Sequence, residues 1–117
     1  MTTKAERLRV AVSTESDKGI KDKVSHGFGR SKTFTILDIE NGKIKKVEII
    51  PNPAESANHG RDPILAKHLA DMNVEMLIAS EVGPGASAML RVYGVQVLKV
   101  ASGKTVYEAL KGNSLIS

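Results

Sequence analysis

The chain has 117 residues, of which 41% are hydrophobic and 26% charged, a balance that excludes a disordered chain and suits one soluble globular domain. No apolar run approaches the roughly 18 residues that a membrane helix needs, and the N-terminal "MTTKAER" lacks the apolar stretch of a signal peptide. We therefore expect a cytoplasmic protein with a flexible tail over residues 1–6 and a single domain over residues 7–117.

Charge and cysteine content narrow the possible partners. The 17 lysines and arginines outnumber the 13 aspartates and glutamates and give a formal net charge of +4, which favours an anionic partner. Aromatic residues make up 3% of the chain, too few for the stacking surfaces of single-stranded nucleic-acid binders. The absence of cysteine excludes disulfides, thiol catalysis and clusters held by protein thiolates. A metal site would have to use histidines, carboxylates or ligands that the guest brings with it.

The first half of the chain predicts a strand, a long loop and a hairpin. Residues 8–12, "LRVAV", are rich in β-branched residues and predict a strand. Residues 13–32 predict a loop of 20 residues, a length that is usually functional or mobile. Residues 33–40 and 43–50 flank Asn41-Gly42, a pair typical of a type I′ turn. A regular two-residue loop then predicts these cross-strand pairs: Glu40 with Lys43, Asp38 with Lys45, Ile36 with Val47, and Phe34 with Ile49.

A helix and a short strand are predicted after the hairpin. Asp62 and Pro63 suit the N-cap and the first position of the helix, and Asn73 suits its left-handed end. The apolar stripe of this helix comprises Leu65, Leu69 and Met72. The segment "EMLIAS", which ends at Ser80, predicts a buried strand.

Another helix, a strand and a final helix complete the chain. Pro84 in "GPGASAML" suits the first turn of a helix that ends near Gly94, and "VQVLKV" predicts the last strand. Thr105 and Glu108 form a capping box for a final helix that stops at Gly112. The alternation implies parallel strands with right-handed crossovers, and the hairpin implies one antiparallel strand. We therefore expect an α/β fold with helices packed on a mixed five-stranded sheet.

Three glycine-containing loops, "SHGFGR", "NHG" and "SEVGPGAS", are expected near one edge of this sheet. Ligands of such sheets bind beyond the carboxyl ends of the parallel strands, so His26, Arg30, His59 and the turn Gly83–Gly85 converge if the topology holds. The helix start after Gly83 offers free N–H groups to an anion, and Arg30 adds a positive fork. Taken singly, each loop is better explained as a plain turn or helix entry, because glycine and proline are common in all loops. The case for a functional site comes from two such loops falling on one edge.

The histidines and the missing motifs bear on chemistry. His26 and His59 lie in glycine-flanked loops where a guest can reach the rings, so they are the candidate metal ligands. His68 lies beside the apolar stripe of the first helix and is interpreted as a packed or half-exposed residue. The chain has no P-loop lysine motif, no G-x-S-x-G and no H-E-x-x-H, and no nucleophile–base pair is visible. We therefore expect no enzymatic activity, with a hydrolase as a minor alternative.

Six segments, between about residues 8 and 110, occur in an order that is more specific than any one of them. They are "VAVS", "FGRSKTFTILDIENGKI", "PNPA" followed by "HG", "LIASEVGPGASAML", "YGVQVLKV" and "TVYEAL". In this order they resemble the dinitrogenase iron–molybdenum cofactor biosynthesis family, the nitrogenase accessory factor-like domains. The resemblance implies a three-layer α/β/α domain of ribonuclease H-like topology, with strand order 3-2-1-4-5 and the second strand antiparallel.

The resemblance also implies a cargo and a set of binding residues. Family members include domains that bind or carry iron–sulfur or iron–molybdenum cofactor precursors. In many members a histidine directly precedes the phenylalanine of a Phe-Gly-Arg motif; here Gly27 holds that place and His26 lies one residue upstream. The residues that match the family's Phe-Gly-Arg and glycine-rich turn are Phe28, Gly29, Arg30, Gly83, Pro84 and Gly85.

Two functions from different classes follow. The first is a non-enzymatic carrier of an anionic iron–sulfur or iron–molybdenum-type cofactor, which brings its own sulfides and is bound through His26, with His59 as a second candidate ligand. Its partners would be cluster donor or acceptor proteins, with no nucleic acid and no membrane. The second is a metal-free regulatory domain that binds a small anion at the same edge. In either case we expect a monomer or a weak homodimer.

Overall fold

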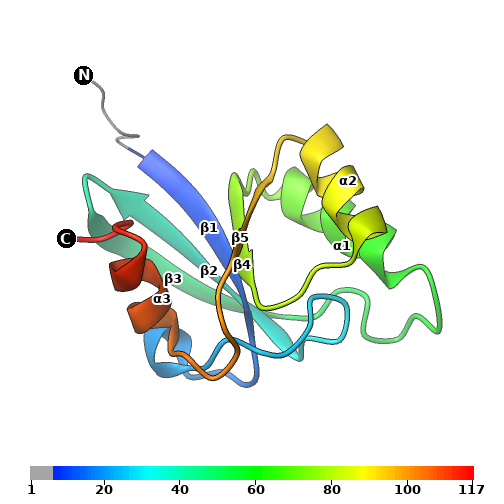
Figure 1. The fold of residues 1–117 in the computed structure, drawn as a ribbon, viewed down its shortest axis with the longest axis horizontal. Coiled ribbons are helices and arrows are strands. Elements are labelled where there is room, and N and C mark those ends of the chain that lie inside the picture. The colour runs from blue at the N-terminus through cyan, green and yellow to red at the C-terminus, as the bar shows by residue number, and fades with distance from the viewer. Residues whose placement is uncertain (1–6) are drawn as a thin grey trace.

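The computed structural model describes residues 7–117, and the predicted tail over residues 1–6 lies outside the described residues. Within the described range, five strands, three α-helices and one 3-10 helix follow one another along the chain (Figure 1). Their bounds are β1 Arg7–Thr14, η1 Gly19–Lys21, β2 Thr33–Glu40, β3 Lys43–Pro51, α1 Arg61–Asp71, β4 Met76–Ala79, α2 Pro84–Val92, β5 Gln96–Lys99 and α3 Val106–Gly112.

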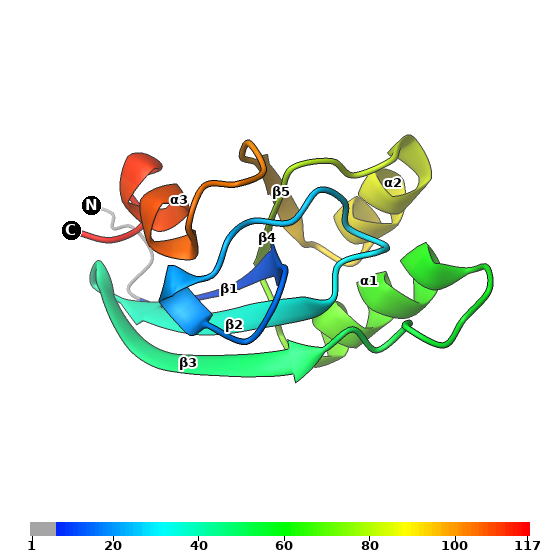
Figure 2. The same cartoon turned by 90° about the horizontal axis from the view of Figure 1, so that it is seen from below.

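The strands form one mixed sheet in the order β3-β2-β1-β4-β5, and Figure 2 shows β3, β2 and β1 side by side. Strand β1 pairs antiparallel with β2 and parallel with β4, while β3 is antiparallel to β2 and β5 is parallel to β4. Strand β2 therefore runs against the other four. The mixed sheet, its order and its antiparallel second strand are confirmed, and the ribonuclease H-like name stays a prediction.

Helices cover both faces of the sheet. Alternate residues of β1 enter two separate cores: Ala11 packs in the core that contains residues of α1 and α2, whereas Val10 and Val12 pack in the core of α3. Both faces of the central strands are therefore buried, as is usual for parallel strands. In Figure 1 the sheet lies between α3 and the pair α1 and α2, which gives three layers.

The predicted hairpin register is wrong beyond the turn. Asn41 and Gly42 have φ of 52° and 79°, as a type I′ turn requires, and Glu40 faces Lys43 as expected. A bulge between Asp38 and Ile39 then shifts the pairing by one residue. The observed pairs are Ile39 with Ile44, Asp38 with Lys46, Leu37 with Val47, Ile36 with Glu48, Thr35 with Ile49, and Phe34 with Ile50.

The bulge has a packing reason. Ile44 and Ile50 lie six positions apart, so a regular strand would point both side chains to the same face. The extra residue lets Ile44 pack against the α3 core and Ile50 against the core of α1 and α2. Edge strand β3 thereby contributes to both cores.

The predicted start of the first helix is also wrong. Helix α1 begins at Arg61, and its N-cap is Gly60 with φ of 71° rather than Asp62. Pro63 is then the third helical residue, where its missing N–H removes no intrahelical hydrogen bond. Asn73, with φ of 63°, follows the helix as predicted. The described helices include none that is long and apolar enough to cross a membrane.

Candidate functional site

Four segments meet at the carboxyl edge of β1, β3, β4 and β5, and we call them together the rim. They are residues 25–32, 52–60, 80–85 and 100–105. The long loop after β1 is more ordered than predicted, because β1 extends to Thr14, η1 follows, and Val24 forms a bridge back to Thr14. The rim therefore contains all the predicted site residues on segments that the sheet positions.

The loop that holds His26 is tied to the end of β4. The backbone N–H of Phe28 donates to the carbonyl of Glu81 over 3.2 Å. The hydroxyl of Ser80 lies 2.8 Å from the carbonyl oxygen of Ser25 and also contacts the carbonyl oxygen of His26. These contacts place His26 beside the segment that leads into the Gly83–Gly85 turn.

Phe28 anchors this loop in the core. Its side chain is 3% exposed, and its ring packs edge-on against Phe34 with centroids 5.8 Å apart and an interplanar angle of 71°. The flanking residues His26 and Arg30 are exposed. The buried ring thus fixes the loop and leaves the two polar side chains on the surface.

The ring of His26 has one side-chain partner among the residues of the described range. Its Nδ1 atom lies 3.4 Å from the hydroxyl oxygen of Ser102, which follows β5. The backbone of the same segment is paired as well: the N–H of Val24 donates to Lys104 over 2.8 Å, and that of Gly103 donates to Val24 over 3.0 Å. Segments that end β4 and β5 therefore both support His26.

The segment of His59 is attached to the other side of the same loop. The side-chain amide of Asn52 donates to the carbonyls of Gly29 and Ser31 over 3.2 and 2.6 Å. Arg61 donates to Gly29 over 3.3 Å and to Glu55 over 3.1 Å. His59 itself is exposed on this segment.

The remaining predicted residues are accessible. Arg30, Gly83, Pro84 and Gly85 are exposed. A Cβ atom built at Gly27, Gly83 or Gly85 would meet nothing within 4 Å, so open space lies next to the backbone at these positions. Gly29 differs, since a Cβ there would lie 3.0 Å from a carboxylate oxygen of Asp62. Helix α2 begins at Pro84 with Gly83 as N-cap and no side-chain cap, which leaves N–H groups of its first turn free for an anion.

Hydroxyl groups fill the space beneath the rim. The hydroxyl oxygen of Ser31, a residue that is 3% exposed, lies 2.9 and 2.7 Å from the carbonyl oxygens of Thr14 and Thr33, and either carbonyl can accept its single proton. Ser13 is fully buried, and its hydroxyl has no hydrogen-bond partner among residues 7–117. Ser13 pairs with Phe34 in the sheet and so lies at the base of the rim.

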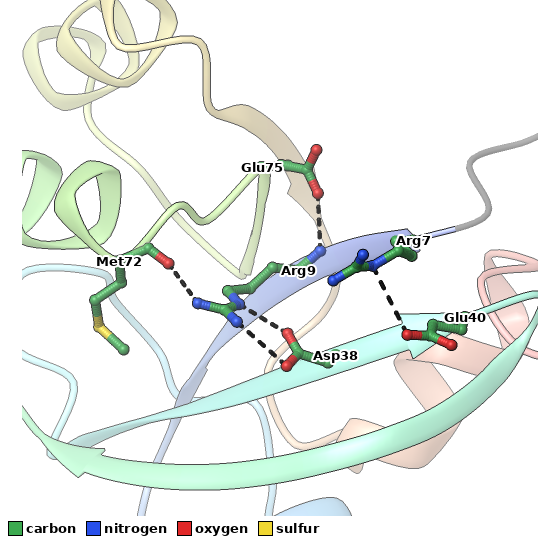
Figure 3. A network of polar contacts seen from close by, with 6 residues as sticks. All are labelled: Arg7, Arg9, Asp38, Glu40, Met72 and Glu75. Atoms are coloured by element: carbon green, nitrogen blue, oxygen red, sulfur yellow. Dashed lines mark hydrogen bonds and ion pairs between the residues drawn. The ribbon is translucent and has the colours of Figure 1, made fainter.

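A hollow lies at the opposite end of the sheet. It has a volume of about 570 Å³ and is lined by residues of β1, β2 and the ends of α1 and α2, among them Arg9, Asp38, Glu75 and Tyr93. Figure 3 shows that its charged groups face one another. The site residues predicted from the sequence all lie outside this hollow.

Arg9 is the centre of this second region. Its guanidinium donates to the two carboxylate oxygens of Asp38 over 2.7 and 3.3 Å and to the carbonyl of Met72 over 2.7 Å (Figure 3). The hydrogen bond with Asp38 raises the pKa of Arg9 above its ordinary value, and the charges of Asp38, Glu48 and Glu75 act in the same direction. Arg9 is therefore a structural residue, since it links β1, β2 and the last turn of α1.

The rim can supply few protein ligands to a metal. No group of three histidine, cysteine, aspartate or glutamate side chains in the part of the chain that the structure describes is arranged to hold an ion. His26 and His59 each offer one exposed imidazole. This donor set suits a guest that arrives with its own ligands better than a bare ion.

Sequence reasoning missed four residues that build the rim: Asn52, Arg61, Ser80 and Ser102. Asn52 had a local signal, because its side-chain oxygen accepts from the N–H of Ala54 over 2.7 Å, an Asx turn typical of Asn-Pro segments. Ser80 and Ser102 have no local signal, since their contacts arise only when distant strand ends meet. Arg61, in the first turn of α1, has a contact with Gly29 from 32 positions away, which the local sequence does not show.

The comparisons with known proteins agree with this architecture. Residues 7–113 match the family "Dinitrogenase iron-molybdenum cofactor". The chain belongs to this family. An uncharacterised protein of Methanocaldococcus jannaschii is 32% identical over 108 residues, which cover 92% of this chain and 86% of that protein.

Two solved structures show the same fold. The orange protein of Desulfovibrio gigas in its apo form is 28% identical with a TM-score of 0.79, over 89% of this chain and 84% of that chain. A NifB-like protein from Thermotoga is 36% identical with a TM-score of 0.74, over 92% and 88% of the two chains. Family membership thus associates the protein with the iron–molybdenum cofactor.

Proposed function

We propose that the protein is a non-enzymatic carrier of an anionic metal–sulfur cofactor or its precursor, of the iron–sulfur or iron–molybdenum type, and that the rim holds this cargo. The observation that carries the proposal is the pair of exposed side chains, His26 and Arg30, on a loop that is otherwise fixed by the buried ring of Phe28. Family membership supports the class of cargo.

Each rim residue has a role that follows from its chemistry. The imidazole of His26 offers one nitrogen to a metal of the cargo, with His59 as a second donor from the neighbouring segment. The guanidinium of Arg30 and the free N–H groups after Gly83 neutralise the negative charge of sulfide-rich cargo. An exposed site with one or two protein ligands suits transfer from a donor protein to an acceptor, since the cargo must leave again.

The positive charge of the protein fits this role. A formal net charge of +4 attracts anions at long range. Arg30 has neither a hydrogen bond nor an ion pair with any residue in the described range, so its charge is available to a guest. Arg9, by contrast, is already paired.

The test is an anaerobic titration with a preformed iron–sulfur cluster, followed by desalting and iron analysis. We expect His26→Ala and Arg30→Ala each to weaken binding by roughly tenfold or more, the loss of about 1.4 kcal/mol or more. His68→Ala and Arg91→Ala are the matched controls, since both remove an exposed side chain of the same type away from the rim. Equal iron retention in all four variants, or none in the native protein, would contradict the proposal.

A metal-free anion-binding domain is the second candidate. The uncapped start of α2 and the open space at Gly83 and Gly85 favour it, because neither feature needs a metal. This candidate predicts thermal stabilisation by small anionic metabolites and no dependence on iron. Stabilisation by phosphate-type anions together with no iron retention would select it over the carrier.

A further inference from the structure

We infer that Ser102 is a positioning residue for His26, which accepts a hydrogen bond from Nδ1–H and so presents the lone pair of Nε2 to the cargo. This inference rests on the proposed carrier function. The contact that supports it joins Nδ1 of His26 to the hydroxyl oxygen of Ser102 over 3.4 Å.

Two serines from neighbouring strand ends act on different parts of His26. Ser80, at the end of β4, contacts the backbone carbonyl of His26 and so fixes the main chain. Ser102, after β5, contacts the ring. His26 is exposed, so without the contact to Ser102 its imidazole would be free to rotate about its side-chain torsions.

The chemistry of imidazole decides the direction of the hydrogen bond in the loaded state. A neutral ring carries one N–H and one lone pair, and only the lone pair can bind a metal. Metal at Nε2 therefore requires the proton at Nδ1, and that N–H needs an acceptor. In the described part of the chain, the hydroxyl of Ser102 is the side-chain group within hydrogen-bond distance of Nδ1.

The position of Ser102 is set by the fold rather than by the loop of His26. Ser102 is partly buried and lies in the segment that pairs with Val24 through the backbone contacts of Gly103 and Lys104. Movement of the two segments is therefore coupled close to the ring. A hydroxyl held in this way reduces the rotamer freedom that the imidazole would lose on binding.

The experiment has a metal-free part and a loaded part. Long-range ¹H–¹⁵N NMR of the histidine rings, recorded on the metal-free protein with neutral imidazole, reports the tautomer of His26. We expect Ser102→Ala to shift His26 away from the Nδ1–H tautomer and Ser102→Thr to retain the native tautomer because it keeps the hydroxyl. Ser117→Ala, which removes an exposed hydroxyl beside Gly42 at the other end of the sheet, should change nothing.

In the loaded part, the iron retained after desalting is compared for the same variants. Loss of the residue that orients a histidine ligand typically weakens metal binding 10- to 100-fold, so we expect about tenfold for Ser102→Ala and recovery in Ser102→Thr. Zn²⁺ serves as a diamagnetic probe of the coordinating atom, with the expected ¹⁵N shift at Nε2.

The outcomes separate this inference from the function on which it rests. An unchanged tautomer mixture in Ser102→Ala, or a Zn²⁺ shift at Nδ1, overturns the role of Ser102 even if His26→Ala still lowers iron retention. A tautomer shift without any iron retention by the native protein supports the contact between Ser102 and His26 and contradicts the carrier function.

Discussion

The two ends of the sheet differ in what happens to their arginines. At the amino end of β1, Arg9 donates to Asp38 and to the carbonyl of Met72, so its charge is used within the fold (Figure 3). At the rim, Arg30 is exposed and has no such partner in the described residues. The hollow around Arg9 is therefore a poorer candidate site than the rim, because a charge already neutralised by the protein has little to offer a ligand.

The two ends also differ in the groups that hold them together. The rim is held by backbone hydrogen bonds, serine hydroxyls and one buried ring, while its imidazole and guanidinium groups remain outside. The amino end is held by its charged side chains themselves. Substitutions of charged residues at the amino end should therefore lower stability, whereas substitutions of the exposed rim side chains should lower cargo binding.

The largest expected effect is that of Phe28→Ala on stability. Removal of a buried aromatic ring costs about 3–5 kcal/mol, and this ring packs against Phe34 beneath the loop of His26. Urea unfolding should show this loss, a smaller one for Phe28→Leu, and almost none for Tyr107→Ala, whose ring is exposed. A loss below about 1 kcal/mol for Phe28→Ala would mean that the core does not hold the rim.

The amino end should respond to Arg9→Met with a loss of stability and no loss of cargo binding. We expect about 1–2 kcal/mol, since the charge-assisted hydrogen bonds are part-exposed and screened by solvent. Because the pKa of Arg9 is raised in the folded state, its contribution is complete below the ordinary arginine range and is lost only as the pH rises through that raised value. The effect should therefore be constant across neutral and mildly alkaline pH.

Arg7→Met is the matched control for that prediction. The Arg7 side chain is 82% exposed, and its Nε atom lies 3.7 Å from a carboxylate oxygen of Glu40. Its removal should therefore change stability by less than about 0.5 kcal/mol. Loss of iron retention in Arg9→Met, without loss in Arg30→Ala, would reverse the assignment of the two ends.

A smaller effect is expected where the rim leads into α3. Thr105→Ala removes a capping box and should cost about 1 kcal/mol in urea unfolding. The pKa of Glu108 is lowered, mainly by the hydrogen bond from the backbone N–H of Thr105, so its contribution is present above the ordinary glutamate pKa and is lost as the pH falls through the lowered value. In Glu108→Gln this loss of stability at acid pH should disappear. An unchanged dependence of stability on acid pH in this variant would contradict the role of the carboxylate.

The smallest effect is expected at Ser13. Its buried hydroxyl lacks a protein partner in the described range, so Ser13→Ala should leave stability unchanged or raise it by up to about 1 kcal/mol. Ser31→Ala is the matched comparison, because that hydroxyl lies within hydrogen-bond distance of two carbonyl oxygens and its removal should cost about 1–3 kcal/mol. Equal losses in thermal unfolding of the two variants would show that Ser13 has a partner after all.

The sequence could predict those features that have local causes. The Asn41-Gly42 turn and the capping box of Thr105 and Glu108 follow from a few adjacent residues, and the structure confirms both. The bulge at Asp38 could not be predicted, because it lets β3 pack against two different cores, and the sequence of the strand alone does not show which core each residue contacts.

The candidate site was predictable in part for the same reason. Glycine-flanked His26 and the turn at Gly83 could be placed at one edge once the strand order was known. The supporting serines, Ser80 and Ser102, could not, since each is brought to His26 by a strand about 55 or more positions away in the chain. Phe28, matched to the family as a cofactor-binding residue, is 3% exposed, so its side chain packs in the core.

The most direct test of the account is to map where a paramagnetic iron–sulfur cluster broadens the backbone amide signals of the ¹⁵N-labelled protein. We predict broadening at the rim glycines Gly27, Gly29, Gly83 and Gly85, with sharp signals at Asn73 and Gly94 beside the hollow. Broadening centred on Asn73 and Gly94, with the rim glycines unaffected, would contradict the claim that the rim holds the cargo.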